Sequence, residues 1–199
     1  MKARQDDRGS AFVGGSSAGA PAGPGGAFRF CPGCGAPEPD FLEGKRWLCR
    51  ACGFELYHNV ATATGLVLDR PEGIVFLERA QEPRAGKLGL PGGFANPGER
   101  AEDSLRRECL EEIGWAPREV CFLGSFPNAY PYRGIVYNTC DLYFYHRAQE
   151  EEDIPELSPC DGEARSIRLI PLAAIRPEDL AFGSTARAIA AYAELARSD

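Results

Sequence analysis

The chain has 199 residues, a formal net charge of -7 and a hydrophobic content of 44%. This length allows one domain of ordinary size together with a small module. The acidic balance argues against broad binding to nucleic acid, so we expect no nucleic-acid partner. No stretch is apolar for long enough to span a bilayer, so we expect no membrane association. Eight cysteines, four in a metal motif and four without a pairing in their spacing, favour a reducing, cytoplasmic location.

Residues 1–27 are dominated by Gly, Ala, Ser and charged residues, and include the low-complexity stretch GGSSAGAPAGPGGA. Such a composition cannot bury enough apolar surface to order the chain, so we expect a disordered tail. The tail also lacks the sustained apolar stretch of a secretory signal.

Two CxxC pairs, separated by fourteen residues, predict a zinc ribbon over residues 28–58. Each second cysteine is followed by a glycine, which lets the backbone turn toward the sulfurs. Four thiolates suit tetrahedral Zn²⁺ and fill its coordination shell, so this zinc is expected to be structural. The alternative is two disulfides, which the missing secretory signal and four further scattered cysteines disfavour. The predicted zinc ligands are Cys31, Cys34, Cys49 and Cys52.

The next segment predicts a β-hairpin. Residues 61–68 and 73–78 are apolar and rich in β-branched residues, and a turn with Pro71 joins them. A polar loop follows over residues 80–88 and leads to a glycine-rich turn.

Residues 100–113 predict an α-helix, because they lack Pro and Gly and are rich in Ala, Leu, Arg and Glu. Gly114 stands where a C-terminal glycine is expected. At about 100° per residue, Leu105, Cys109 and Ile113 fall on one stripe, which we assign to the core.

Three glutamates share a second stripe of this helix: Glu108, Glu111 and Glu112. Like charges at these spacings repel each other on a helix surface. A hard divalent cation such as Mg²⁺ or Mn²⁺ prefers carboxylate oxygens and would remove the repulsion. The alternative is an acidic face exposed to solvent.

Beyond the helix we expect strands at residues 120–126, 135–147 and 166–170, with an aromatic, proline-rich loop at 125–134 and an acidic loop at 150–160. A short helical turn is expected at 172–175 and an amphipathic helix at 184–197, with Ser184 as its N-cap. Strands interleaved with two helices predict an α+β fold with a mixed sheet covered on both faces.

The spacing of residues 93–115 resembles the signature of the Nudix hydrolases, in which a loop-helix-loop binds metal and cleaves a nucleoside diphosphate linked to another group. The resemblance implies a Nudix-type α/β/α sandwich over residues 59–199. It implies Mg²⁺ or Mn²⁺ as cofactor and hydrolysis by activated water. It implies Glu108 and Glu112 as main metal ligands, Glu111 as a further ligand or base, Glu99 and the Gly93 carbonyl as supporting ligands, and Arg107 as the group that orients the glutamates.

A zinc ribbon ahead of such a domain resembles the NADH pyrophosphatase branch, whose substrate-binding array is only partly matched by residues 125–133. The resemblance implies that Tyr130 or Tyr132 stacks on a base, with Arg133 near phosphate. The alternative is a rigid aromatic turn that packs on the core. Pro131 fits ADP-ribose hydrolysis equally well, so the array does not separate the two substrates.

Glu163 lies where many relatives place a catalytic base or extra ligand, and the acidic run at 150–153 is an alternative. The expected function is hydrolysis of the pyrophosphate bond in NADH, ADP-ribose or a similar dinucleotide or nucleotide sugar. The alternative functions are a catalytically silent nucleotide sensor and an interaction module built on the zinc ribbon. A homodimer is left open.

Overall fold

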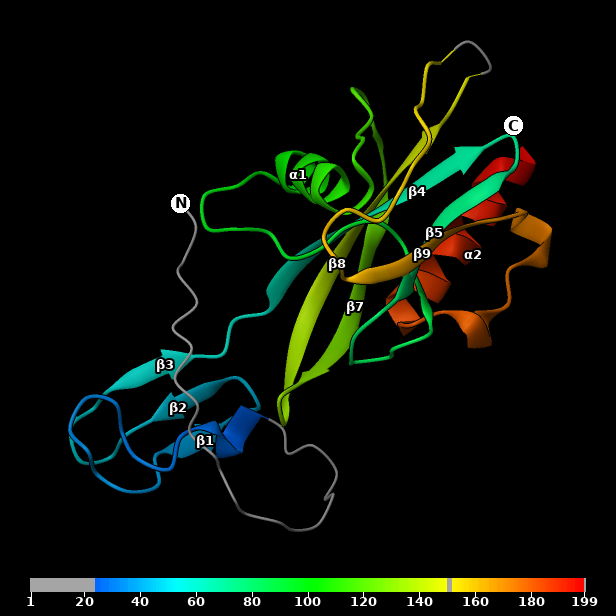
Figure 1. The fold of residues 1–199 in the computed structure, drawn as a ribbon. Coiled ribbons are helices and arrows are strands. Elements are labelled where there is room, and N and C mark those ends of the chain that lie inside the picture. Colours follow the sequence, from blue (N-terminus) through cyan, green and yellow to red (C-terminus); the bar gives the residue numbers. More distant parts are fainter. Residues whose placement is uncertain (1–23, 150–151, 199) are drawn as a thin grey trace.

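The structure, a computed structural model, describes residues 24–149 and 152–198 and shows two folded units along the chain (Figure 1). Residues 1–23 of the predicted disordered tail lie outside the described residues. The last four residues of that tail form a short 3-10 helix, η1 (Pro24–Ala27).

The N-terminal unit is a three-stranded antiparallel sheet in the order β1-β2-β3. Trp47 forms its centre, because the side chain is 4% exposed and the rings of Phe28 and Phe41 both lie 4.8 Å from it. The only other hydrophobic residues buried in this unit are Cys31 and Cys49. So small a core cannot by itself order a domain, and the cysteines must contribute to its stability. The strands are β1 (Asp40–Leu42), β2 (Arg46–Leu48) and β3 (Glu55–Tyr57).

The larger unit is built on a six-stranded sheet in the order β6-β5-β4-β8-β7, with β9 paired to β5. β4 and β8 run parallel, whereas the other pairs are antiparallel, which confirms the predicted mixed sheet. The strands are β4 (Ala61–Arg70), β5 (Gly73–Arg79), β6 (Leu88–Gly89), β7 (Cys121–Tyr132), β8 (Ile135–Arg147) and β9 (Ala164–Ile170).

Two helices, α1 (Ala101–Ile113) and α2 (Gly183–Ser198), cover opposite faces of this sheet (Figure 1). Successive side chains of a strand point to opposite faces, so Leu66 packs with the α1 layer and Val67 with the α2 layer. The predicted core stripe of α1 is confirmed, because Leu105, Cys109 and Ile113 are buried beneath it. Two 3-10 turns precede α2: η2 (Leu172–Ala174) and η3 (Pro177–Asp179).

The predicted loop at residues 125–134 is wrong, because β7 continues without a break to Tyr132. Its residues pair with β8 along almost their whole length, from Cys121 opposite Tyr145 to Tyr132 opposite Ile135. β7 lies at the edge of the sheet, and an edge strand tolerates prolines such as Pro127 and Pro131.

The predicted N-cap of the last helix is also wrong. α2 begins at Gly183, so Ser184 lies inside the first turn, and it is fully buried. Its hydroxyl donates to the Asp141 carboxylate at 2.6 Å instead of capping the helix. This bond joins the start of α2 to β8.

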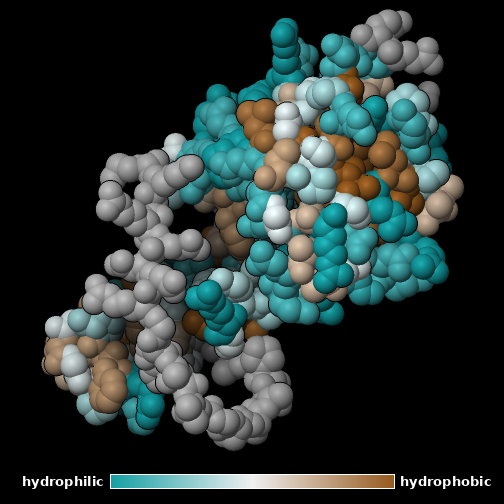
Figure 2. Space-filling view, viewed as in Figure 1, coloured by the Kyte–Doolittle hydropathy of each residue, from teal (hydrophilic) through white to brown (hydrophobic). Residues whose placement is uncertain are grey.

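The surface seen in this view is mostly hydrophilic, and hydrophobic residues gather where the ribbon shows β4, β5 and β9 (Figure 2). Among the exposed large hydrophobic side chains is Leu169 of β9, which is 40% exposed. None of the described helices is long and apolar enough to cross a membrane.

We predict that Leu105→Ala lowers the free energy of unfolding by about 2–5 kcal/mol, because it leaves a cavity between α1 and the sheet. Leu110→Ala is the matched control, since Leu110 lies on the same helix and is 55% exposed. It should change stability by no more than about 0.5 kcal/mol. Urea denaturation of the two variants measures both values, and equal losses would contradict the assignment of the core stripe.

Candidate active site

A glycine-containing loop lies alongside the first half of β4. The amide of Thr64 donates to the Gly93 carbonyl at 2.8 Å, and the amide of Leu66 donates to the Pro91 carbonyl at 2.8 Å. Gly92 has a φ of +140°, and a Cβ there would lie 2.1 Å from the Thr64 carbonyl oxygen. Only glycine therefore fits at this position. The loop is held close against the sheet, and its Gly92 amide faces the adjacent helix α1.

The Glu112 carboxylate of α1 accepts a hydrogen bond from this loop. The Gly92 N–H donates to this carboxylate at 2.7 Å, and Glu112 is 8% exposed. Burial chiefly raises the pKa of the Glu112 carboxyl group to about 8, and the nearby Asp161 and Glu108 carboxyl groups act in the same direction. A carboxylate held in such surroundings favours a cation beside it.

The loop before β9 brings two more carboxylates to Glu112. The Cys160 amide donates to the Glu112 carbonyl at 3.0 Å, and the Ala80 amide donates to the Glu163 carbonyl at 2.8 Å. These bonds fix both ends of the loop. Carboxylate oxygens of Glu112, Asp161 and Glu163 consequently lie within 4.8 Å of one another, close enough to share one cation.

Asp161 was not among the predicted site residues. The available signal was its position two residues before Glu163, but nothing in the sequence shows that this loop meets α1. In the structure the Asp161 carboxylate also accepts a hydrogen bond from the Glu163 amide at 2.8 Å.

Arg107 binds three more glutamates, two on α1 and one just before it. Its guanidinium donates to Glu99 at 2.9 Å, to Glu108 at 2.6 Å and to Glu111 at 3.1 Å. The bond to Arg107 lowers the pKa of Glu99 to about 2, whereas burial raises the pKa of Glu108. Arg107 therefore fixes the orientation of Glu108 by a charge-assisted hydrogen bond.

The predicted metal ligands divide into two groups. Glu108, Glu112 and Gly93 line one cavity of the described residues, the main cavity, together with Glu163. Glu99 and Glu111 do not line it, and the side chain of Glu111 is 56% exposed.

The cavity has a volume of about 390 Å³ and extends from the carboxylates to an aromatic wall. The rings of Phe94 and Phe182 lie 5.4 and 5.5 Å from the ring of Tyr130. Arg79 also lines the cavity, with its guanidinium 5.3 Å from the Phe182 ring. Phe94 and Phe182 were missed in the sequence, where the only hint was the place of Phe94 directly after Gly93.

Of the three predicted substrate-binding residues, the structure places only Tyr130 in this cavity. Tyr132 lines a second, apolar groove of about 240 Å³, which it shares with Phe94 and Tyr130. Arg133 lies in the turn between β7 and β8, where its guanidinium is 5.3 Å from the Tyr132 ring.

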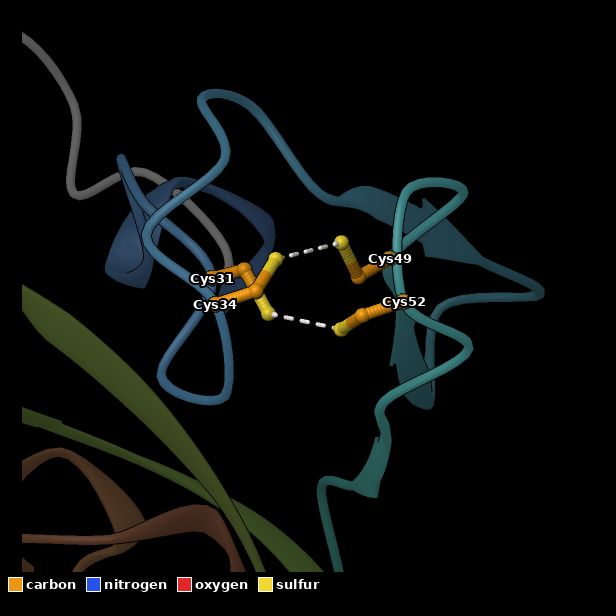
Figure 3. A group of neighbouring side chains, drawn as sticks. All are labelled: Cys31, Cys34, Cys49 and Cys52. Atoms are coloured by element: carbon orange, nitrogen blue, oxygen red, sulfur yellow. Dashed lines mark hydrogen bonds between the residues drawn. The ribbon is translucent and has the colours of Figure 1, made fainter.

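The four cysteines of the N-terminal unit converge on one point (Figure 3). The sulfurs of Cys31 and Cys52 are 3.7 Å apart, as are those of Cys34 and Cys49, and all four cysteines are free. Zn–S bonds of about 2.3 Å place tetrahedral sulfurs about 3.8 Å apart. The pKa of the Cys49 thiol is lowered to about 7, chiefly by a hydrogen bond from the Cys52 backbone amide. A lowered pKa favours the thiolate form, which binds metal. The cluster is therefore compatible with a zinc ribbon.

Comparison with known proteins finds a matching family and several relatives. A family model described as NUDIX domain matches residues 59–192. The "NAD-capped RNA hydrolase NudC" of Pseudomonas fluorescens is 31% identical over 99 residues, which cover 49% of this chain and 35% of that protein. The "ADP-ribose pyrophosphatase" of Methanocaldococcus jannaschii is 33% identical over 73 residues, which cover 37% of this chain and 43% of that protein. The match thus spans about a third of the NudC relative.

Among solved structures, a NUDIX hydrolase from Nitrosomonas europaea superposes with a TM-score of 0.52 at 25% sequence identity. The superposition covers 81% of this chain and 88% of that chain.

We predict that Gly92→Ala destabilises the protein strongly, because the added Cβ would collide with the backbone of β4. Gly86→Ala is the control, since Gly86 also has a positive φ but has no atom within 4 Å of the added Cβ. The control should lower the free energy of unfolding by only about 1–2 kcal/mol. Chemical denaturation compares the two, and similar losses would show that the contact with β4 is not tight.

Proposed function

This chain belongs to the NUDIX domain family, and we propose that it hydrolyses the pyrophosphate bond of a nucleoside diphosphate derivative with the help of divalent cations. The observation that supports this most directly is the convergence of Glu112, Asp161 and Glu163, of which Glu112 and Glu163 line a cavity large enough for a nucleotide. The substrates we consider are NADH, ADP-ribose and similar dinucleotides or nucleotide sugars.

Mg²⁺ or Mn²⁺ fits the donor set at this end of the cavity, because hard cations prefer carboxylate oxygens. Glu108 and Glu112 would hold the cations together with Asp161 and Glu163, and the Gly93 carbonyl is a further candidate. When bound, such cations offset the charge of the phosphate oxygens and make water a better nucleophile. Arg107 would act indirectly, by holding Glu108 in position.

Glu163 is the better candidate for the general base. It lines the cavity, whereas Glu111 lies outside it and forms an ion pair with Arg107. A base must lie within hydrogen-bond reach of the water whose proton it accepts. The water would attack phosphorus, Glu163 would accept its proton, and two phosphorylated products would leave.

The aromatic wall would hold the base of the substrate. Phe94, Tyr130 and Phe182 contribute flat rings to the cavity, and such rings bind planar heterocycles by stacking or edge contacts. The names of two relatives, which refer to NAD and to ADP-ribose, support a substrate that contains adenine.

We predict that Glu108→Gln and Glu112→Gln each lower turnover of the substrate by at least a hundredfold, while the folded state is retained. The amide has the same shape as the carboxylate but binds a hard cation poorly. The measurement is release of phosphorylated products from NADH and ADP-ribose in Mg²⁺ or Mn²⁺, with and without EDTA.

Glu102→Gln is the matched control, because Glu102 lies on the same helix and forms only a surface ion pair with Arg100 at 3.5 Å. It should retain full activity. Unchanged turnover in the Glu108→Gln, Glu112→Gln double variant would remove these residues from the mechanism. Nucleotide binding without any turnover by the unaltered protein would instead indicate a sensor.

For the N-terminal unit, we propose a structural zinc ion bound by Cys31, Cys34, Cys49 and Cys52. Four sulfur ligands leave no coordination position for a substrate, so this ion would stabilise the fold and take no part in hydrolysis. The free energy of zinc binding would add to the stability that the small core around Trp47 provides.

We predict that the purified protein contains one zinc per chain and that Cys49→Ser loses it, together with the tertiary structure around Trp47. Cys121→Ser is the control, because Cys121 is an exposed free cysteine outside the cluster. Elemental analysis measures the zinc, and near-UV circular dichroism reports the environment of the tryptophan. Full zinc content in the Cys49→Ser variant would contradict the assignment.

A further inference from the structure

The floor of the main cavity holds a buried carboxylate that the proposed mechanism does not use. Asp141 lies on β8 and is 6% exposed, yet it lines the same cavity as Glu108 and Glu112. It occupies the sheet face covered by α2, since Tyr143, two residues along the strand, packs in the α2 layer. It therefore belongs to the part of the cavity that faces the aromatic wall.

Three side chains hold this carboxylate in place. Thr139 donates to Oδ1 at 2.6 Å, while Asn128 and Ser184 donate to Oδ2 at 3.0 and 2.6 Å. These bonds come from β8, β7 and α2, so the carboxylate cannot turn without disturbing three elements. A polar group held so rigidly is suited to recognising a ligand by a hydrogen bond of fixed direction.

The bonding pattern leaves one place for a ligand. A carboxylate has about four acceptor positions, and the donors take two at Oδ2 and one at Oδ1. Within residues 24–149 and 152–198, no lysine, arginine or histidine forms an ion pair with Asp141. The remaining position of Oδ1 can therefore accept a hydrogen bond from a molecule in the cavity.

The surroundings indicate what kind of donor fits. Phe94, Tyr130 and Phe182 form the aromatic wall of this cavity, which suits a planar ring. A carboxylate only accepts hydrogen bonds, so at Asp141 an amino group on the ring is favoured over a carbonyl oxygen. The cation that lines this cavity, Arg79, lies instead beside the Phe182 ring. Adenine carries such an amino group, whereas hypoxanthine carries an oxygen at the same ring position.

We propose that Asp141 is a specificity-determining residue, which selects an adenine base by accepting a hydrogen bond from its amino group. This inference rests on the proposed function, because it assumes that the diphosphate of the substrate lies at Glu108 and Glu112. It adds to that function the residue that reads the base. Replacing the amino group by oxygen would bring two acceptors together in a buried site, which is strongly unfavourable.

The test compares ADP-ribose with inosine diphosphate ribose, which differ only in the base. The unaltered protein should hydrolyse ADP-ribose with a kcat/KM at least tenfold higher. In Asp141→Asn the ratio should fall to within about threefold of unity, because the amide can donate to the oxygen of hypoxanthine. An unaltered protein that does not distinguish the two substrates would overturn the proposal, as would a folded Asp141→Asn variant that keeps the original ratio.

Asp69→Asn is the matched control. The Asp69 carboxylate of β4 also joins the sheet to α2, because it accepts a hydrogen bond from the Tyr192 hydroxyl at 2.5 Å, but it does not line the cavity. The thermal midpoint should fall while the preference for ADP-ribose is kept. A loss of preference in Asp69→Asn equal to that in Asp141→Asn would show that the preference depends only on the contact between α2 and the sheet, and would overturn the proposal.

The result also separates this inference from the proposed function. Hydrolysis of both substrates at equal rates would contradict the role of Asp141 and leave the hydrolase intact. Failure to hydrolyse either would contradict the hydrolase, and calorimetric binding of AMP and IMP to the unaltered protein would then decide the role of Asp141. Tighter binding of AMP would support it, and equal binding or no binding would overturn it.

Discussion

The carboxylate of Glu112, buried beneath the Gly92 amide, is the constraint on which the site depends. Burial raises its pKa to about 8, and an acidic group is unfavourable in such a place unless something compensates for its lost hydration. The Gly92 N–H supplies part of that compensation. The Glu112 carboxylate also lies close to those of Asp161 and Glu163. Three carboxylates at this distance repel one another, and a cation bound between them would make the arrangement favourable. The geometry of the site thus suits the binding of divalent metal.

The same contact explains how one cavity reaches both sides of the sheet. Because the glycine loop lies along the first half of β4, it places Gly92 against α1. The next residues turn the Phe94 ring toward Tyr130, which stands on β7. One cavity is therefore lined both by the carboxylates of Glu108, Glu112 and Glu163 and by the rings of Phe94, Tyr130 and Phe182. This combination suits a ligand with a charged diphosphate and a flat base.

The N-terminal unit follows a different physical rule. Its core consists of little more than Trp47 with the rings beside it, and its strands have three residues each. A unit of this size cannot bury enough apolar surface to be stable, so further interactions between side chains must stabilise its fold. The cluster of four cysteines is the feature able to do so.

The sequence alone determined the elements whose signal is local. The helix ending at Gly114, its buried stripe and the strand at 135–147 follow from periodicity and from glycine placement, because those properties depend on neighbouring residues. The cysteine cluster could also be predicted from the sequence, since the spacing of the cysteines within a short segment limits where their sulfurs can lie. Tertiary structure decided the rest. Pairing with β8 turned the expected loop at 125–134 into a strand, and the long-range bond to Asp141 drew Ser184 into the core. The meeting of Asp161 with Glu112, 49 residues earlier in the chain, likewise required the folded sheet, because contacts between distant segments depend on how the layers pack and leave no periodic trace in the sequence.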